Sequence, residues 1–173
     1  DKKITTYEVG FMIGPRLNSM GRLEHAVNSL RLLCTHNPEK AADLATLLND
    51  TNKLRQTETD GSIIHATNQV TNNQVTGILL VADASYHPGV IGLIAAKLMD
   101  AFNRPVIAVS IGEEVSKGSG RSLPGFHITD FLRSHEKLFT NLGGHAGACG
   151  FTIKTSQLDQ LAQLVQLVQL DPA

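Results

Sequence analysis

The sequence predicts an α/β fold in which a central sheet is flanked by helices and preceded by one long helix. Two continuous apolar runs of strand length, 77–82 and 105–111, are typical of strands buried inside a sheet. The segment between them, 88–102, is apolar at helical spacing, so strand and helix alternate as they do in α/β proteins. Ahead of this unit, residues 37–70 repeat apolar side chains at helical spacing around a polar centre.

The first segment, through Glu24, is predicted to be irregular, because glycine and proline interrupt it at short intervals. Within it, residues 13–23 are expected to form a loop that carries Arg16 and Arg22 with hardly any apolar periodicity. Two interpretations fit this loop equally well. It is an ordinary surface loop, or its arginines reach phosphate groups.

A long helix is predicted to begin at Pro38. Asn37 is a favoured N-cap residue, proline suits the first helical position, and Glu39 places an acid in the first turn. Residues 49–60 in the middle of the pattern are almost wholly polar. We therefore expect one long helix, or two in line, that is solvated where it connects two bodies.

The remaining elements follow in order along the C-terminal half. Residues 115–122 are expected to form a strand that ends in a basic glycine–serine loop, followed by a short helix over 127–138 and a strand at 151–153. The final helix starts at Ser156 in a capping-box-like sequence, and its regularly spaced glutamines are expected on the solvated side. The ligand site of such a domain should lie among loops at one edge of the sheet.

Two glycine-rich stretches indicate a phosphate site. Residues 143–150, GGHAGACG, surround His145 with small residues, as in a loop whose backbone N–H groups cradle an anion. Residues 117–122, KGSGRS, add two cations and two hydroxyls to a second expected turn. Each stretch alone is also compatible with a simple tight turn. Two of them in one small domain favour a phosphate site.

Composition indicates a folded, soluble protein and excludes one that binds nucleic acid through its overall charge. Hydrophobic residues make up 42% of the 173 residues and charged residues 18%, and the formal net charge is −1. Binding to an acidic polymer therefore needs a local cluster of cations. No apolar run approaches the roughly 20 residues of a membrane span, and the start resembles no signal peptide. Cys34 and Cys149 show no metal-ligand spacing and are expected to be reduced and buried in a cytoplasmic protein.

Five motifs in one order resemble the bacterial RecJ family of single-stranded-DNA-specific exonucleases, which belongs to the DHH phosphoesterase superfamily. Each motif alone is weak, but their combination covers nearly the whole chain. The motifs are IGPRLN at 13–18 with GRL at 21–23, NKLRQ at 52–56, HPGVIG at 87–92, GSGRS at 118–122 and GGH at 143–145.

The resemblance implies that this chain is a fragment, because no Asp-His-His triplet occurs in it. Residues 1–30 would be the C-terminal tail of a DHH domain, 31–73 a linking helix and 74–173 a DHHA1 domain. In the family, the DHH domain holds Mn²⁺ or Mg²⁺ and an OB-fold commonly follows. We therefore expect single-stranded DNA and those missing domains as partners, with no catalytic residue and no metal ligand in this chain.

The resemblance also assigns binding roles. Arg121, Ser119 and Ser122 would grip the 5′-terminal phosphate or nearby backbone, His145 and its glycines would line the same cleft, and two arginines would approach from the DHH side. His87 would cap the following helix, with phosphate binding as the less favoured role. The candidate binding residues are Arg16, Arg22, His87, Lys117, Ser119, Gly120, Arg121, Ser122, Gly143, Gly144 and His145.

Two alternatives remain at this point. A phosphodiesterase for short oligonucleotides or cyclic dinucleotides shares the glycine–histidine loop, although residues 13–23 and the polar-centred helix favour the exonuclease. A non-catalytic module that binds nucleotide or protein in the same cleft belongs to a different class. The aromatic residues form no alternating basic–aromatic pattern, so stacking of bases along a strand is not indicated.

Overall fold

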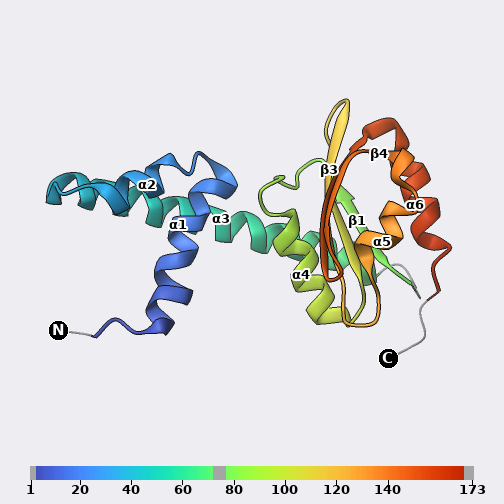
Figure 1. Ribbon diagram of the computed structural model, residues 1–173, viewed down its shortest axis with the longest axis horizontal. Coiled ribbons are helices and arrows are strands. Elements are labelled where there is room, and N and C mark those ends of the chain that lie inside the picture. Colours follow the sequence, from blue (N-terminus) through green and yellow to red (C-terminus); the bar gives the residue numbers. More distant parts are fainter. Residues whose placement is uncertain (1–2, 72–76, 170–173) are drawn as a thin grey trace. The chain divides into compact units, whose positions relative to one another are not determined.

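The computed structural model describes residues 3–71 and 77–169 (Figure 1). The chain divides into two compact units, Asp1–Glu58 and Thr59–Ala173. Helix α3 (Pro38–Thr71) contributes residues to both units.

The N-terminal unit is helical, so the irregular segment expected through Glu24 is wrong. A π-helical turn, η1 (Glu8–Ile13), leads into α1 (Gly14–Leu23), and α2 (Val27–Cys34) follows. Pro15 lies in the first turn of α1, where the N–H that proline lacks would have no intrahelical partner anyway. Met20 is fully buried and supplies the packing that the weak periodicity did not reveal.

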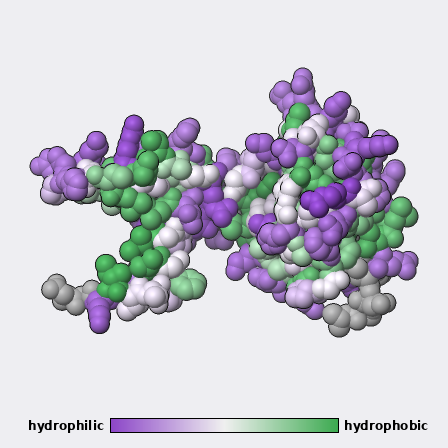
Figure 2. Space-filling model, viewed as in Figure 1, coloured by the Kyte–Doolittle hydropathy of each residue, from purple (hydrophilic) through white to green (hydrophobic). Residues whose placement is uncertain are grey.

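Hydrophobic surface runs along the short helices of this unit (Figure 2). Phe11 is 73% exposed and Leu33 67% exposed, whereas large apolar side chains in a folded domain are usually buried. Cys34, which was expected to be buried, is exposed as well. The large exposed apolar residues of the unit are Ile4, Tyr7, Val9, Phe11, Met12, Ile13, Val27, Leu30, Leu33, Leu47 and Leu54.

The long helix is confirmed as the single helix α3. The backbone N–H of Lys40 donates to Asn37 Oδ1 at 3.0 Å, which is the predicted N-cap bond. The expectation that its polar centre is solvated holds only in part, because Thr51, Asn52 and Thr59 are buried.

The C-terminal unit contains a mixed five-stranded sheet in the order β1-β2-β3-β5-β4. Strands β1 and β2 are parallel and joined through α4 (Ile91–Phe102), whereas the other neighbouring pairs are antiparallel. The α/β prediction is thereby confirmed. The strands are β1 (Leu79–Asp83), β2 (Val106–Ser110), β3 (Val115–Arg121), β4 (Phe139–His145) and β5 (Ala148–Lys154).

The two faces of the sheet are covered differently. Helices α5 (Ile128–Arg133) and α6 (Leu158–Gln166) lie on one side and α4 on the other (Figure 1). The main core lies on the α5 and α6 side, where burial of apolar side chains stabilises the sheet. Its buried members are Ile78, Ile107, Val109, Ile128, Leu132, Cys149, Phe151, Ile153, Leu161 and Val165.

Several predicted boundaries are wrong. Helix α4 begins at Ile91 and not at Pro88, and the helix predicted over 127–138 is split into α5 and a separate 3₁₀ turn, η2 (Glu136–Leu138). The predicted capping box does not form. Instead, the 3₁₀ turn η3 (Thr155–Gln157) precedes α6, and Gln157 caps α6 without a side-chain hydrogen bond.

Candidate functional site

The basic glycine–serine stretch lies inside strand β3, so the flexible turn predicted for it is wrong. Its glycines face the core. A Cβ on Gly118 would overlap the ring of Phe151, and a Cβ on Gly120 would lie 2.5 Å from Cys149 Sγ. These two glycines are therefore required by close packing within the sheet and not by a backbone cradle for an anion.

The intervening side chains of β3 point to the opposite face, toward α4. Arg121 Nη1 donates to Ser119 Oγ at 3.0 Å and to the Gly120 carbonyl at 2.7 Å. The Ser119 hydroxyl in turn donates to the Cys149 carbonyl at 3.3 Å. Ser119 is buried and Arg121 half-buried, so the guanidinium is held in one orientation by its own strand.

Helix α4 approaches this guanidinium at a glycine. A Cβ on Gly92 would lie 2.9 Å from Arg121 Nη2 and 3.3 Å from Ser119 Oγ. Gly92 is in the first turn of α4, at the positive end of the helix dipole. The positive end of the helix and the guanidinium thus lie together, an arrangement that attracts an anion.

His87 does not cap α4, contrary to the preferred prediction. The N-cap is Val90, which makes no side-chain bond, and His87 Nδ1 accepts the Gly89 backbone N–H at 3.0 Å. His87 therefore closes the turn that leads into α4. Because Nδ1 is an acceptor, the neutral ring carries its proton on Nε2.

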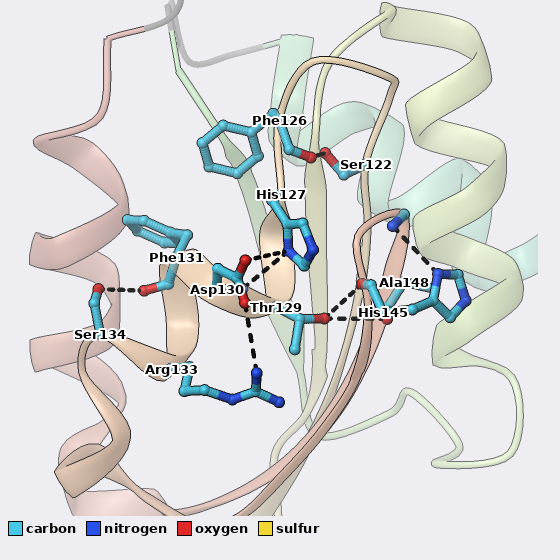
Figure 3. Close-up of polar contacts among 11 residues, drawn as sticks. Ser122, Phe126, His127, Thr129, Asp130, Phe131, Arg133, Ser134, His145 and Ala148 are labelled. Carbon is cyan, nitrogen blue, oxygen red and sulfur yellow. Dashed lines mark hydrogen bonds and ion pairs between the residues drawn. The ribbon is translucent and has the colours of Figure 1, made fainter.

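The predicted glycine–histidine loop is the end of strand β4 and a tight hairpin into β5. Gly144 has a φ of 153°, and a Cβ there would lie 2.6 Å from the Cα of Cys149. The Thr129 hydroxyl donates to the His145 carbonyl at 2.6 Å and to the Ala148 carbonyl at 3.3 Å, which fixes the hairpin on α5 (Figure 3). His145 Nδ1 accepts the Gly147 N–H at 3.3 Å, and the ring is exposed.

The strand register brings part of the predicted set onto one face. Arg121 pairs with Ala148, and Ala148 pairs with His145. Directly opposite residues project to the same face, so the guanidinium and the imidazole lie on either side of one small residue, with backbones roughly 10 Å apart. Ser119 and Gly143 occupy the next row, on either side of Gly150.

Other predicted residues do not converge on that point. Lys117 is exposed on the same face but four residues along an extended strand, about 13 Å from Arg121. The Ser122 hydroxyl is buried and donates to the Phe126 carbonyl at 2.7 Å (Figure 3). It closes the turn before α5.

The two N-terminal candidates lie on α1 in the other unit. Arg16 donates to Asn49 Oδ1 at 3.1 Å and to the Met12 carbonyl at 2.6 Å, bonds that hold α1 to α3 and to η1. Arg22 is half-buried in the last turn of α1.

Sequence reasoning missed a polar contact between α3 and the loop after β1. Tyr86, fully buried in the loop after β1, places its hydroxyl 3.0 Å from Nδ1 of His65 on α3. Burial, and then the charge of Asp83, raises the pKa of Tyr86 to about 12. Hydrogen bonds from Ser85 lower the pKa of Asp83. The contact joins a histidine and a tyrosine that are far apart in sequence, and no local pattern reveals it.

Divalent metal does not fit the residues of this part of the chain. Among residues 3–71 and 77–169, no group of three or more His, Cys, Asp and Glu side chains could hold a metal ion. A Mn²⁺ or Mg²⁺ site needs several oxygen ligands that converge. Within the same residues, no helix is both long and apolar enough to cross a membrane.

Residues 67–169 match the family model of the DHHA1 domain. Because the match spans more than half of the chain, the chain belongs to the DHHA1 domain family. Relatives of the whole segment share one name, the single-stranded-DNA-specific exonuclease RecJ. The Bacillus subtilis protein is 36% identical over 153 residues, which are 87% of this chain and 20% of the relative. The Escherichia coli protein is 33% identical over 163 residues, which are 88% of this chain and 28% of the relative.

Solved structures that match this chain are also RecJ proteins. The crystal structure of RecJ from Thermus thermophilus in complex with Mn²⁺ matches with a TM-score of 0.83 and 32% sequence identity, over 92% of this chain and 24% of that one. A crystal structure of exonuclease RecJ bound to manganese matches with a TM-score of 0.79 and 31% identity, over 94% of this chain and 40% of that one. The resemblance found in the motifs is confirmed, and the chain spans well under half the length of these relatives.

Proposed function

We propose that this chain is the nucleic-acid-binding part of a metal-dependent 5′→3′ single-stranded-DNA exonuclease, and that Arg121 and Ser119 hold the 5′-terminal phosphate. In this proposal residues 1–30 are the tail of a DHH domain, 31–73 the linking helix and 74–173 the DHHA1 domain. Hydrolysis and its Mn²⁺ or Mg²⁺ belong to the DHH domain of the longer protein, with an OB-fold as a further partner.

The surface of the N-terminal unit supports this division. Its short helices expose large apolar side chains, among them Phe11 and Leu33, which a complete domain would bury against neighbouring elements. A DHH domain of which residues 1–30 are only the tail would supply that cover.

One observation carries the binding role, namely the fixed guanidinium of Arg121. Its Nη1 is engaged by Ser119 Oγ and the Gly120 carbonyl, and no acceptor among the described residues takes the N–H groups of Nε and Nη2. A planar fork held in this way presents two parallel donors, the geometry that matches two phosphate oxygens. Little side-chain entropy remains to be lost when an anion binds.

Local electrostatics favour the same ligand despite the net charge of −1. Strands β3, β4 and β5 contain no aspartate or glutamate. The first turn of α4 meets the guanidinium at Gly92 and adds the positive end of a helix dipole. His145, in the same row as Arg121, adds an exposed imidazole that can donate to the second side of a bound phosphate group.

The contribution of these residues to the reaction is positioning and neutralisation of charge. A 5′-terminal phosphate anchored at Arg121 places the first phosphodiester at a fixed distance from the anchor, so that the metal-bearing domain cleaves at a defined step from the end.

The test compares two ligands with the 173-residue chain. Fluorescence anisotropy measures binding of the same deoxythymidine octamer with a 5′-phosphate and with a 5′-hydroxyl. We expect tighter binding of the phosphorylated octamer, and a difference that shrinks as salt is raised. Equal affinity at low salt would contradict a terminal-phosphate site.

A further inference from the structure

The sheet face that carries Arg121 extends beyond the proposed phosphate site. Alternation and register place three further residues of β3, β5 and β4 on it, in the row that joins Lys117, Thr152 and Asn141. Lys154 follows on β5, opposite the exposed Val115. Lys117, Asn141 and Lys154 are exposed, and Thr152 is half-buried.

Nothing in the described unit covers this part of the face. Helix α4 packs on β2 and β3, and a Cβ built on Gly150 or Gly143 would meet no atom within 4 Å. Between the guanidinium row and the Lys117 row, the surface of β5 and β4 is therefore bare backbone that a ligand can approach closely. Figure 1 shows α4 beside β3, whereas β4 and β5 carry helices only on their other side.

The charged side chains that β3 and β5 place on this face are all positive. Lys117 and Lys154 are diagonal neighbours on adjacent strands, roughly 7–8 Å apart. No ion pair joins either lysine to a carboxylate among the described residues. Together with Arg121 they place three cations on β3 and β5, two strands that contain no acid, in a chain whose formal net charge is −1.

We infer that Lys117, Lys154 and Asn141 bind the sugar–phosphate backbone of single-stranded nucleic acid downstream of its 5′-terminal phosphate. This inference rests on the proposed phosphate site at Arg121. The span of about 13 Å from Arg121 to Lys117 covers roughly four nucleotides at the rise of one stacked strand, and fewer in an extended one. The two lysines therefore each engage one internal phosphate, and Asn141 supplies a neutral donor beside them.

The occupant is a backbone and not a row of bases. Among the described residues of β3, β4 and β5, no Phe, Tyr or Trp projects from this face, because Phe151 lies on the core side and Phe139 pairs with the core residue Ile153. Stacking platforms are thus absent from it, and recognition is electrostatic and independent of base identity.

The experiment measures salt dependence for two ligands, a 5′-phosphorylated thymidine dinucleotide and a 5′-phosphorylated octamer, each with the 173-residue chain. Each neutralised phosphate contributes about −0.7 to the slope of log affinity against log salt. Lys117→Gln with Lys154→Gln should make the octamer slope less steep by about 1.4 and leave dinucleotide binding unchanged. Asn141→Lys should make the octamer slope steeper by about 0.7.

The matched control is Arg133→Gln with Lys137→Gln, which removes two exposed cations from α5 and η2 and should leave both slopes unchanged. An octamer slope that is the same in the Lys117/Lys154 variant and the wild type would overturn the inference. That result would not contradict the proposed function if Arg121→Ala still weakened the binding of both ligands. A lowered octamer slope with no effect of Arg121→Ala on either ligand would instead contradict the proposed terminal-phosphate site.

Discussion

Replacing Arg121 by alanine tests how the site works. The substitution removes the guanidinium that is held by Ser119 Oγ at 3.0 Å and by the Gly120 carbonyl at 2.7 Å. A charge-assisted hydrogen bond from this group to a phosphate contributes about 1.5–3 kcal/mol. Affinity for a 5′-phosphorylated strand should therefore fall about 10- to 150-fold.

Arg121→Lys separates charge from geometry. A lysine ammonium restores the positive charge but not the planar fork, and it cannot reproduce the bonds that hold Arg121 to Ser119 and Gly120. We expect it to recover only part of the lost affinity. Binding of the 5′-hydroxyl octamer should change much less in both variants, because it lacks the group that Arg121 contacts.

The assay is anisotropy with both octamers, run beside thermal unfolding of each variant. Loss of two intramolecular hydrogen bonds should lower stability by about 1–3 kcal/mol, so binding is compared at a temperature where all variants are folded. In the longer enzyme the same variants should lose kcat/KM on phosphorylated substrate. An unchanged preference for the 5′-phosphate in folded Arg121→Ala would refute the reasoning.

Four further outcomes follow from the structure. Gly120→Ala places a Cβ 2.5 Å from Cys149 Sγ and should lower the free energy of unfolding, measured by urea denaturation, by about 1–3 kcal/mol. An unchanged urea midpoint would show that β3 is not tightly packed at this position. Because burial raises the pKa of Tyr86 to about 12, the folded state holds that proton more tightly than the unfolded one, so stability should fall as pH rises from about 10 through 12. Tyr86→Phe should abolish that fall and lose the bond to His65, whereas an identical pH profile in the variant would assign the fall to other groups. A thiol reagent should react with the exposed Cys34 in the native protein. It should react with the buried Cys149, whose pKa is raised by burial to about 11, only after unfolding. Two thiols that react rapidly in the native protein would contradict the placement of Cys149 in the core. The purified 173-residue chain should release no nucleotides from labelled single-stranded DNA with Mn²⁺ or Mg²⁺, since its described residues hold no cluster of metal ligands. Metal-dependent release that is lost in Arg121→Ala purified in the same way would contradict this, whereas equal release from both proteins would come from a contaminating nuclease.

Long or strongly apolar elements could be predicted from the sequence. Strands β1 and β2 are continuous apolar runs, and a buried strand needs no further signal. Helix α3 carries its own start signal, since Asn37 makes the cap bond that its residue type favours. These features are local, so neighbouring residues alone determine them.

Glycine-rich elements could not be predicted, because the sequence does not show whether a glycine serves a flexible turn or makes room for a side chain of another strand. In β3, Gly118 and Gly120 make room for Phe151 and Cys149, which come from another strand. Only the strand pairing distinguishes that use from a flexible loop. Helix α1 was missed for a related reason, since Gly14 and Pro15 suggest a break although proline fits a first helical turn.

The candidate site was predictable in residue type and not in arrangement. Arg121 and Ser119 were singled out by their chemistry, and the structure adds that they hold each other. Register, which a sequence does not specify across distant strands, aligns His145 with Arg121. The extended backbone of β3 places Lys117 about 13 Å from Arg121, where a loop could have brought them together.

The central claim is that a 5′-phosphate binds at the α4 side of β3, and an amide NMR titration tests it most directly. The isotope-labelled chain is titrated with a 5′-phosphorylated thymidine dinucleotide and, as the control, with its 5′-hydroxyl form. We expect phosphate-dependent shifts centred on the backbone amides of Gly92, Ser119, Gly120 and Arg121, with the amides of α5 and α6 unmoved. Phosphate-dependent shifts confined to α5 and α6, or the same shifts with both dinucleotides, would contradict it.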